Sequence, residues 1–361
     1  MARLYVGNFD FEHRLANPGQ QLPAKLDRIN AELALSWLAI ADEGDYIWTP
    51  QPVESSFFEQ TTLNGIPHVN PVVSFNSVPR GVECIPWGWT DDLRRLCDAH
   101  GWHHLDPLSA AVRAGNSRRF SAGLEREWQV GLDGAHEVHS LHQLAELIAD
   151  LGPVVRWVVK AEFGMSGRER LLGCGELTQQ DCKWAFKRIE SDGAVFLEPW
   201  VERLDEVGIQ LEVPRAGSPK MIGVTPLLVD DRGQYSGSWF TTGEPEAETW
   251  APAIEVALNA AQRLQELGYF GPVGIDAMRY RAPDGTIRIR PLQDINARWT
   301  MGRLSLGWRR LLCPGERAAC WRHDPRGTND LDTHRLARII STSPERVGNV
   351  ATHHQSYLLI R

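Results

Sequence analysis

The sequence predicts a mixed fold of the α/β (α+β) class that is built from more than one unit. Short apolar stretches with strand-like alternation recur along the chain, and amphipathic helical segments with capping residues stand between them. The 361 residues are enough for two or three units of ordinary domain size. Hydrophobic residues make up 42% and charged residues 23%, so we expect an ordinary globular protein with buried cores.

The first part of the chain, residues 1–110, predicts a small α/β unit. Between residues 53 and 79 no periodicity is clear. The aromatic turn Pro86-Trp87-Gly88-Trp89 is consistent either with core packing or with the wall of a substrate cleft. The elements expected here are a strand at 2–8, a helix at 24–41, a strand at 46–48, and a helix from Thr90, its capping residue, to about Ala99.

The remainder of the chain alternates between helix and strand signals. Ser140 and Gln143 form a capping-box pattern, and Pro252 is well placed at the start of a helix. Beyond Pro314 the sequence is charged and polar, with a short helix candidate at 333–340. The other expected elements are a helix beginning near residue 116, a helix at 140–151, strands at 154–160, 193–200, 207–213 and 220–229, and a helix at 252–267.

Charge and cysteine usage limit the partners and the compartment. The formal net charge of −8 provides no broad cationic surface for nucleic acid or an anionic membrane. The six cysteines include no Cys-x-x-Cys pair, which favours reduced thiols. The first residues indicate a strand rather than a signal peptide, and no apolar run reaches the ~18 residues of a membrane span. We therefore expect a cytoplasmic protein with no nucleic-acid or membrane partner.

The most informative segment is Gly271–Gly302, GPVGIDAMRYRAPDGTIRIRPLQDINARWTMG, which predicts two strands joined by a tight turn at Asp284-Gly285. Asp276 lies on the first strand. On the second, Asp294, Asn296 and Arg298 are two residues apart, so their side chains point to one face. Oxygen donors on adjacent strands suit Mg²⁺, with Mn²⁺ as an alternative. We predict that Asp276, Asp294 and Asn296 bind this metal.

This hairpin resembles the metal-binding end of the ATP-grasp superfamily, in which an acidic residue on one strand precedes a Glu-x-Asn-x-Arg strand. Asp294 stands where glutamate is usual. Aspartate is one methylene shorter but keeps the charge and the donor atoms. The resemblance implies an ATP-grasp fold, in which two α+β subdomains grip ATP after a small α/β pre-ATP-grasp domain. It implies ATP as the cofactor together with Mg²⁺.

A second matching segment is WVVKAEFGMSGRER, from Trp157 to Arg170. Lys160 ends an apolar strand and a small-residue loop follows it, as in the segment that covers the triphosphate in ATP-grasp enzymes. Small residues allow backbone amides to approach phosphate oxygens closely. The spacing differs from that of a P-loop. The resemblance implies phosphate contacts from Lys160, Gly164, Ser166, Gly167 and Arg168.

A third segment, VFLEPWVERLDEVGIQ, resembles the interdomain hinge of the superfamily. By residue match, Glu198, Trp200 and Val201 would flank the adenine. The acid that binds the ribose would be Asp205 or Glu206, and the sequence does not decide between them. Each segment, taken alone, also fits solvated surface residues.

The segment Asn116-Ser117-Arg118 resembles the helix start that carries the first phosphate lysine of the superfamily, with arginine in place of lysine. Arg118 could bind phosphate in the same way, because a guanidinium provides fixed positive charge and can contact two oxygens. A position for Arg118 or Arg119 on a solvated helix face is the alternative. The four segments follow one another in the order that the superfamily has.

The resemblance also implies a domain organisation. Residues 1–112 would form the pre-ATP-grasp-like domain, and residues 113–310 the ATP-grasp domain, with a first lobe at 113–200 and a metal-binding lobe at 201–310. Residues 311–361 would be a C-terminal extension. The resemblance leaves a homodimer open.

The implied activity is that of an ATP-dependent carboxylate-amine ligase. A carboxylate would attack the γ-phosphate to give an acylphosphate and ADP, and an amine would then displace phosphate. Positioning and charge neutralisation by the metal, Lys160 and an arginine would assist this transfer. Arg298 is the candidate for holding the acyl substrate. The alternatives are a small-molecule kinase of the same fold and a nucleotide-binding protein without chemistry.

Overall fold

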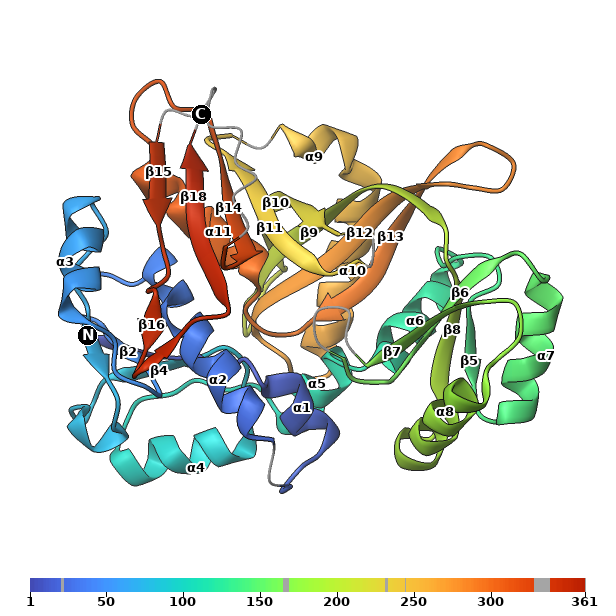
Figure 1. Cartoon of the computed structure of the whole chain (residues 1–361), viewed down its shortest axis with the longest axis horizontal. Coiled ribbons are helices and arrows are strands. Elements are labelled where there is room, and N and C mark those ends of the chain that lie inside the picture. Colours follow the sequence, from blue (N-terminus) through green and yellow to red (C-terminus); the bar gives the residue numbers. More distant parts are fainter. Residues whose placement is uncertain (21–22, 165–168, 231–232, 244, 328–337, 361) are drawn as a thin grey trace.

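The structure is a computed structural model that describes residues 1–20, 23–164, 169–230, 233–243, 245–327 and 338–360. The described strands form three sheets of four or more strands and one short two-stranded pair, and helices pack against the sheets (Figure 1). The mixed α+β class is as predicted. All six cysteines are free thiols. Within the described residues, no helix has both the length and the apolar character needed to cross a lipid bilayer.

The N-terminal unit is built on a parallel sheet in the order β3-β2-β1-β4, at the lower left of Figure 1. Its strands are β1 (Arg3–Val6), β2 (Tyr46–Trp48), β3 (Asn70–Val72) and β4 (Glu83–Pro86). Its helical segments are α1 (Phe11–Ala16), α2 (Ala24–Leu33), the 3-10 helix η1 (Ala34–Ala39), α3 (Ser55–Leu63), the 3-10 helix η2 (Phe75–Ser77) and α4 (Asp91–His100).

Local sequence signals predict this unit only in part. Helix α4 begins as expected, because the Thr90 hydroxyl accepts a hydrogen bond from the backbone N–H of Leu93 at 3.3 Å. The continuous helix expected at 24–41 is wrong: α2 ends at Leu33 and η1 follows it. Every residue of η1 is buried, so packing on all sides rather than helical periodicity decides its geometry. The segment without clear periodicity contains α3 and β3.

The first lobe, at the right of Figure 1, is an antiparallel sheet in the order β5-β8-β6-β7 with its own hydrophobic core. Ser140 caps α7 as predicted, by accepting a hydrogen bond from the backbone N–H of Gln143 at 3.2 Å. The elements of this lobe are β5 (His136–Val138), α7 (Leu141–Leu151), β6 (Arg156–Lys160), β7 (Arg170–Cys174), α8 (Gln179–Asp192) and β8 (Val195–Pro199). Helices α5 (Ser109–Gly115) and α6 (Arg118–Trp128) precede them in the chain, and their buried apolar residues belong to the largest hydrophobic cluster described below.

The largest sheet has eight strands in the order β13-β12-β9-β10-β11-β14-β18-β15. The predicted hairpin is present: β12 and β13 pair in antiparallel fashion, and Gly285 in the turn between them has φ +82°. The strands are β9 (Glu202–Val213), β10 (Lys220–Val229), β11 (Tyr235–Thr241), β12 (Gly271–Arg281), β13 (Ile287–Asn296), β14 (Ala318–Pro325), β15 (Arg338–Ser341) and β18 (His354–Ile360).

The C-terminal part of the chain differs from its prediction. Three of its strands, β14, β18 and β15, extend the large sheet, and β16 (Arg346–Val347) pairs with β17 (Val350–Ala351). The helix predicted at 333–340 is wrong for residues 338–340, which belong to β15, and residues 333–337 lie outside the described part of the chain. Pairing with β18 determines this conformation, since only one of the four residues of β15 is buried.

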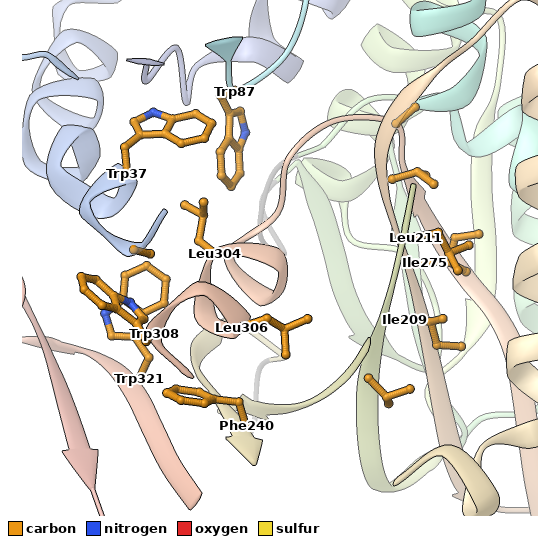
Figure 2. Packing of buried hydrophobic residues seen from close by; sticks show 14 of the residues in the cluster. Trp37, Trp87, Ile209, Leu211, Phe240, Ile275, Leu304, Leu306, Trp308 and Trp321 are labelled. Atoms are coloured by element: carbon orange, nitrogen blue, oxygen red, sulfur yellow. The ribbon is translucent and has the colours of Figure 1, made fainter. Parts of the chain in front are cut away.

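A single hydrophobic cluster joins the N-terminal unit, the large sheet and the C-terminal strands. Figure 2 shows Leu304 of α11 beneath Trp37 and Trp87 of the N-terminal unit. In the same cluster, the rings of Trp308 and Trp321 lie 5.8 Å apart. The remaining helices are α9 (Glu246–Thr249), α10 (Ala251–Glu266), α11 (Met301–Gly307) and the 3-10 helix η3 (Trp308–Leu311).

Candidate active site

A cavity of about 680 Å³ lies where the first lobe, the large sheet, the N-terminal unit and the C-terminal strands meet. Of the site residues predicted from sequence, all that the structure describes line this cavity except Asp205. Residues far apart in the chain are therefore brought together. The predicted residues that line it are Arg118, Lys160, Gly164, Glu198, Trp200, Val201, Glu206, Asp276, Asp294, Asn296 and Arg298.

The two predicted carboxylate ligands face each other across the hairpin. Asp276 on β12 is directly opposite Asp294 on β13 in the strand register. Burial, together with repulsion from Asp294 and Glu206, raises the pKa of Asp276 to about 7. Three carboxylates thus crowd one side of the cavity, an arrangement that a divalent cation would stabilise. No group of three His, Cys, Asp or Glu side chains among the described residues forms a metal cluster, and the predicted set pairs two acids with an amide.

Asn296 and Arg298 are held by their neighbours. The amide nitrogen of Asn296 donates to Oδ2 of Asp276 at 3.3 Å, and its oxygen accepts from Nη2 of Arg298 at 2.8 Å. Arg298 also binds Glu12 of α1, and Nη1 donates to the backbone oxygen of Trp299 at 2.8 Å. In this geometry the nitrogen of Asn296, not its oxygen, faces Asp276. A ligand role for Asn296 requires its amide to rotate.

Lys160 belongs to a buried network of four charges. Its Nζ donates to Oε2 of Glu198 at 2.7 Å, and Arg290 of β13 binds the same carboxylate at 2.9 and 3.1 Å. Arg290 also binds Glu125 of α6 at 2.5 and 2.8 Å. Burial lowers the pKa of Lys160, and Arg118 and Arg290 add repulsion that lowers it further. Burial alone would raise the pKa of Glu198, but Arg290 and Lys160 hold it below its usual value.

Further cations converge on the same side of the cavity. Arg118 donates from Nη1 to Oδ2 of Asp294 at 3.1 Å, and from Nε to the backbone oxygen of Ala161 at 3.0 Å. Burial and repulsion from Arg203 and Arg118 lower the pKa of Arg170. Burial is the larger cause, but both arginines contribute, so an anion placed between these cations would be stabilised.

The structure separates the two acids that the sequence left open. Asp205 and Glu206 are neighbours on β9 and therefore point to opposite faces of the sheet. Asp205 is outside the cavity and forms an ion pair with Arg279, whose Nε lies 2.7 Å from its Oδ1. Glu206 is buried and lines the cavity. Only Glu206 can therefore contact a ligand inside it.

The predicted phosphate loop is described only at its ends. Gly164 lines the cavity. Ser166, Gly167 and Arg168 lie outside the described residues.

Comparison with known proteins identifies the fold. No protein-family model matches the sequence, and a search of curated proteins found no match. Among solved structures, the N5-carboxyaminoimidazole synthetase of Staphylococcus aureus in complex with ADP is similar with a TM-score of 0.55 at 11% identity, over 100% of this chain and 92% of that chain. The biotin carboxylase domain of the Hydrogenobacter thermophilus 2-oxoglutarate carboxylase, a dimer in complex with MgADP, ADP and bicarbonate, is similar with a TM-score of 0.55 at 10% identity. This match covers 100% of this chain and 86% of that chain. The N5-carboxyaminoimidazole ribonucleotide synthetase of Thermus thermophilus is similar with a TM-score of 0.53 at 15% identity, over 100% of this chain and 94% of that chain. These neighbours are ATP-grasp proteins.

The chain has the ATP-grasp fold. Because these matches cover the whole chain, the N-terminal unit and the C-terminal strands lie within the matched region together with the two central lobes.

Sequence reasoning missed two charged residues of this ATP-grasp site, Glu125 and Arg290. Arg288 and Arg290 alternate on β13 like residues of a solvated face, yet Arg290 is only 2% exposed. The register between β12 and β13 shifts between Asp276 and Met278, and this shift is not visible in the sequence. The apolar neighbours of Arg290 carry no signal for its two acidic partners. Glu125 lies on α6, a helix whose start the sequence predicted, so its position on that helix was the one signal that could have identified it as a partner of a buried cation.

The donor set fits the ligands that ATP-grasp neighbours hold. Asp276 and Asp294 offer hard oxygen donors for Mg²⁺, and Asn296 would add a third after rotation of its amide. Burial and the neighbouring acids Asp294 and Glu206 raise the pKa of Asp276, and a bound cation would offset this repulsion. The N-terminal unit adds Trp87 to the cavity wall, buried at 5% exposure, so this tryptophan both packs in the core and lines the cleft. Trp89 packs against the core.

Proposed function

We propose that this protein is an ATP-dependent ligase that activates a carboxylate as an acylphosphate and joins it to an amine, with release of ADP and phosphate. One observation supports this most directly. A single cavity holds a cationic group, Lys160, Arg118 and Arg170, beside an anionic group, Asp276, Asp294 and Glu206. Burial is the largest cause of the pKa shifts of Lys160, Arg170 and Asp276, and like charges nearby add to each shift. A triphosphate with a bound divalent cation would complement both.

The nucleotide is proposed to lie along the hinge that links the two lobes. The chain from Glu198 to Val201 would flank the adenine, and Glu206 would accept hydrogen bonds from the ribose hydroxyls. Lys160, Arg118 and the backbone of Gly164 would then bind phosphate oxygens. The guanidinium groups of Arg203, Arg156 and Arg170 lie 4.5, 5.5 and 5.7 Å from the ring centre of Trp200, so they hold this ring in place at the hinge.

The metal would be held by Asp276, Asp294 and Asn296. When bound, Mg²⁺ supplies charge neutralisation and orientation of the β- and γ-phosphates. The residues of the chain do the rest. Lys160 and Arg118 stabilise the charge that develops on the transferred phosphoryl group, and the surrounding lobes exclude water.

Arg298 is proposed to act on the acyl substrate. Its contacts to Asn296, Glu12 and the Trp299 oxygen fix the guanidinium beside the metal residues. There it would stabilise the carbonyl oxygen on which negative charge gathers when the amine adds to the acylphosphate. Collapse of that intermediate breaks the carbon–oxygen bond to phosphate and releases phosphate.

A screen for ADP release tests this function. Purified protein, ATP and Mg²⁺ are incubated with amino acids and small carboxylates, singly and in pairs, and products are identified by mass spectrometry. We expect ADP release that depends on a carboxylate and an amine, together with an amide whose mass equals that of the pair less water. Asp294→Asn should abolish release, and Asp284→Asn, a change at the exposed hairpin turn, should not.

Other outcomes would assign a different function. ADP release with a phosphorylated hydroxyl or carboxylate and no amide would indicate the kinase alternative. Nucleotide binding without turnover across the whole screen would indicate a binding protein.

A further inference from the structure

The N-terminal unit contributes one wall to the cavity, which we call the N-terminal wall. Its residues come from the loop and helix after β1, from α2 and from the turn after β4. Most are apolar, and two are carboxylates. They are Phe9, Glu12, Ile29, Glu32, Leu33 and Trp87.

The two carboxylates of this wall differ in how their oxygens are used. Both oxygens of Glu32 accept hydrogen bonds from the backbone N–H of His353, at 3.0 and 3.1 Å, and Arg28 donates to Oε1 at 2.7 Å. In Glu12, Oε1 is bound by Arg298. Oε2 of Glu12 accepts no hydrogen bond from any described residue, although the side chain is only 4% exposed. A buried carboxylate oxygen without a donor is unfavourable, so the site lacks a donor at this point.

The neighbours of Glu12 indicate the chemical character of a ligand that would donate a hydrogen bond to it. Phe9 is 2% exposed, and its ring centre lies 4.6 Å from that of Trp87. The guanidinium of Arg298 lies 5.1 Å from the Trp87 ring. Ile29 and Leu33 extend the same apolar wall. A group that donates to Oε2 of Glu12 would therefore meet apolar side chains with the remainder of its structure.

We propose that the N-terminal wall binds the amine substrate, as a primary ammonium group that donates to Oε2 of Glu12 and carries an apolar substituent. The word substrate rests on the proposed ligase function, whereas the binding site does not. Positive charge is preferred because a charge-assisted hydrogen bond to a carboxylate is stronger than a neutral one. Glu12 and Arg298 form one ion pair, so an amine on Glu12 would lie next to an acyl group on Arg298. The pair would thereby place the two reacting groups side by side.

The test uses the full chain and two probes of the same shape, 3-methylbutylamine and 3-methylbutanol, measured by titration calorimetry. We expect the amine to bind saturably and at least tenfold more tightly than the alcohol, because only the amine is charged. Glu12→Gln should weaken amine binding at least tenfold and leave alcohol binding unchanged. Glu59→Gln is the control, since it removes the same charge at an exposed position of α3 that does not line the cavity, and it should retain amine binding.

Equal binding of the amine and the alcohol by the native chain would overturn the proposal, as would unchanged amine affinity in Glu12→Gln. If Glu12→Gln does not fold, Glu12→Asp takes its place: its carboxylate is one methylene shorter, so amine binding should weaken while alcohol binding should not, and unchanged amine affinity would overturn the proposal. ATP binding is titrated separately. If the native chain binds the amine through Glu12 but does not bind ATP, only the proposed ligase function is contradicted. If it releases ADP but does not prefer the amine over the alcohol, only the proposed amine site at the N-terminal wall is contradicted.

Discussion

The carboxyl group of Asp276 makes the stability of the protein depend on pH, because of the acidic residues around it in the cavity. This carboxyl group is buried beside Asp294 and Glu206, which raises its pKa to about 7. A carboxyl group with a raised folded-state pKa binds more protons in the folded than in the unfolded chain. Its contribution to stability is therefore fully present below its unfolded pKa of about 4 and is lost as pH rises through 7.

We expect Asp276→Asn to remove this part of the pH dependence. Near pH 8 the variant should be more stable than the native chain by on the order of 2 kcal/mol, since an amide avoids the repulsion. Below pH 4 the difference should vanish. Urea unfolding of both proteins between pH 4 and pH 8, without nucleotide or divalent cations, measures it. Parallel stability curves would show that Asp276 is not the group that titrates.

The metal residues should separate activity from stability. We expect Asp294→Asn and Asn296→Ala each to reduce ATP turnover at least about 100-fold, because each weakens or removes an oxygen ligand of the metal. Circular dichroism and thermal unfolding should show a folded protein in both cases. Near-native turnover in the two variants would exclude the metal assignment at this hairpin.

At the scale of elements, Arg290 connects three of them: its own strand β13, the hinge strand β8 through Glu198, and α6 through Glu125. It is 2% exposed and fully paired. Removing one member of such a network leaves charges without partners in a buried place. The ion pairs of Arg290 thus link the first lobe to the large sheet, and loss of one partner should lower the free energy of unfolding.

We expect Arg290→Met to destabilise the protein by roughly 3 kcal/mol or more, since Glu125 is left buried without its partner. The double variant Arg290→Met, Glu125→Leu should recover much of this loss, because Glu198 keeps its ion pair with Lys160. Urea unfolding of the native chain, both single variants and the double variant gives the coupling energy. Additive losses would show that Arg290 and Glu125 act independently.

Elements with strong local signals could be predicted from the sequence, and elements formed by distant contacts could not. The helix after Thr90 and the hairpin at Asp284-Gly285 carry their own caps and turn residues. Strand β15 carries none, because its conformation depends on pairing with β18. The same holds for the site. The hairpin acids follow from alternation on one strand, whereas Glu12 meets Arg298 across 286 residues of sequence.

At the scale of the whole molecule, the cavity is walled by both the N-terminal and the C-terminal parts of the chain. The large hydrophobic cluster includes Tyr5 and Trp37 together with Leu358 of β18. The first lobe has a separate core. A destabilising substitution in β18 should therefore also destabilise the N-terminal unit and the β12–β13 hairpin, whereas the stability of the first lobe should depend less on β18.

We expect Leu358→Asp to lower the melting temperature by at least about 10 °C, because the side chain is 0% exposed and the charge would be buried without a partner. Ile339→Asp in the neighbouring strand β15 is the matched control. Its side chain is 48% exposed, so its melting temperature should stay within a few degrees of the native value. Similar losses in both variants would indicate that sheet pairing, rather than burial in the shared core, determines the effect.

The order of strands in the large sheet has a consequence for synthesis on the ribosome. Strand β15 precedes β18 in the chain, yet β18 lies between β14 and β15 and is the only described strand that pairs with β15 (Figure 1). Until residues 354–360 have emerged, β14 has an unpaired edge and β15 has no strand to join. Exposed edges of this kind invite pairing with other chains. A nascent chain stalled before residue 354 should therefore depend on chaperones, although nearly all residues of the proposed nucleotide site have already been made.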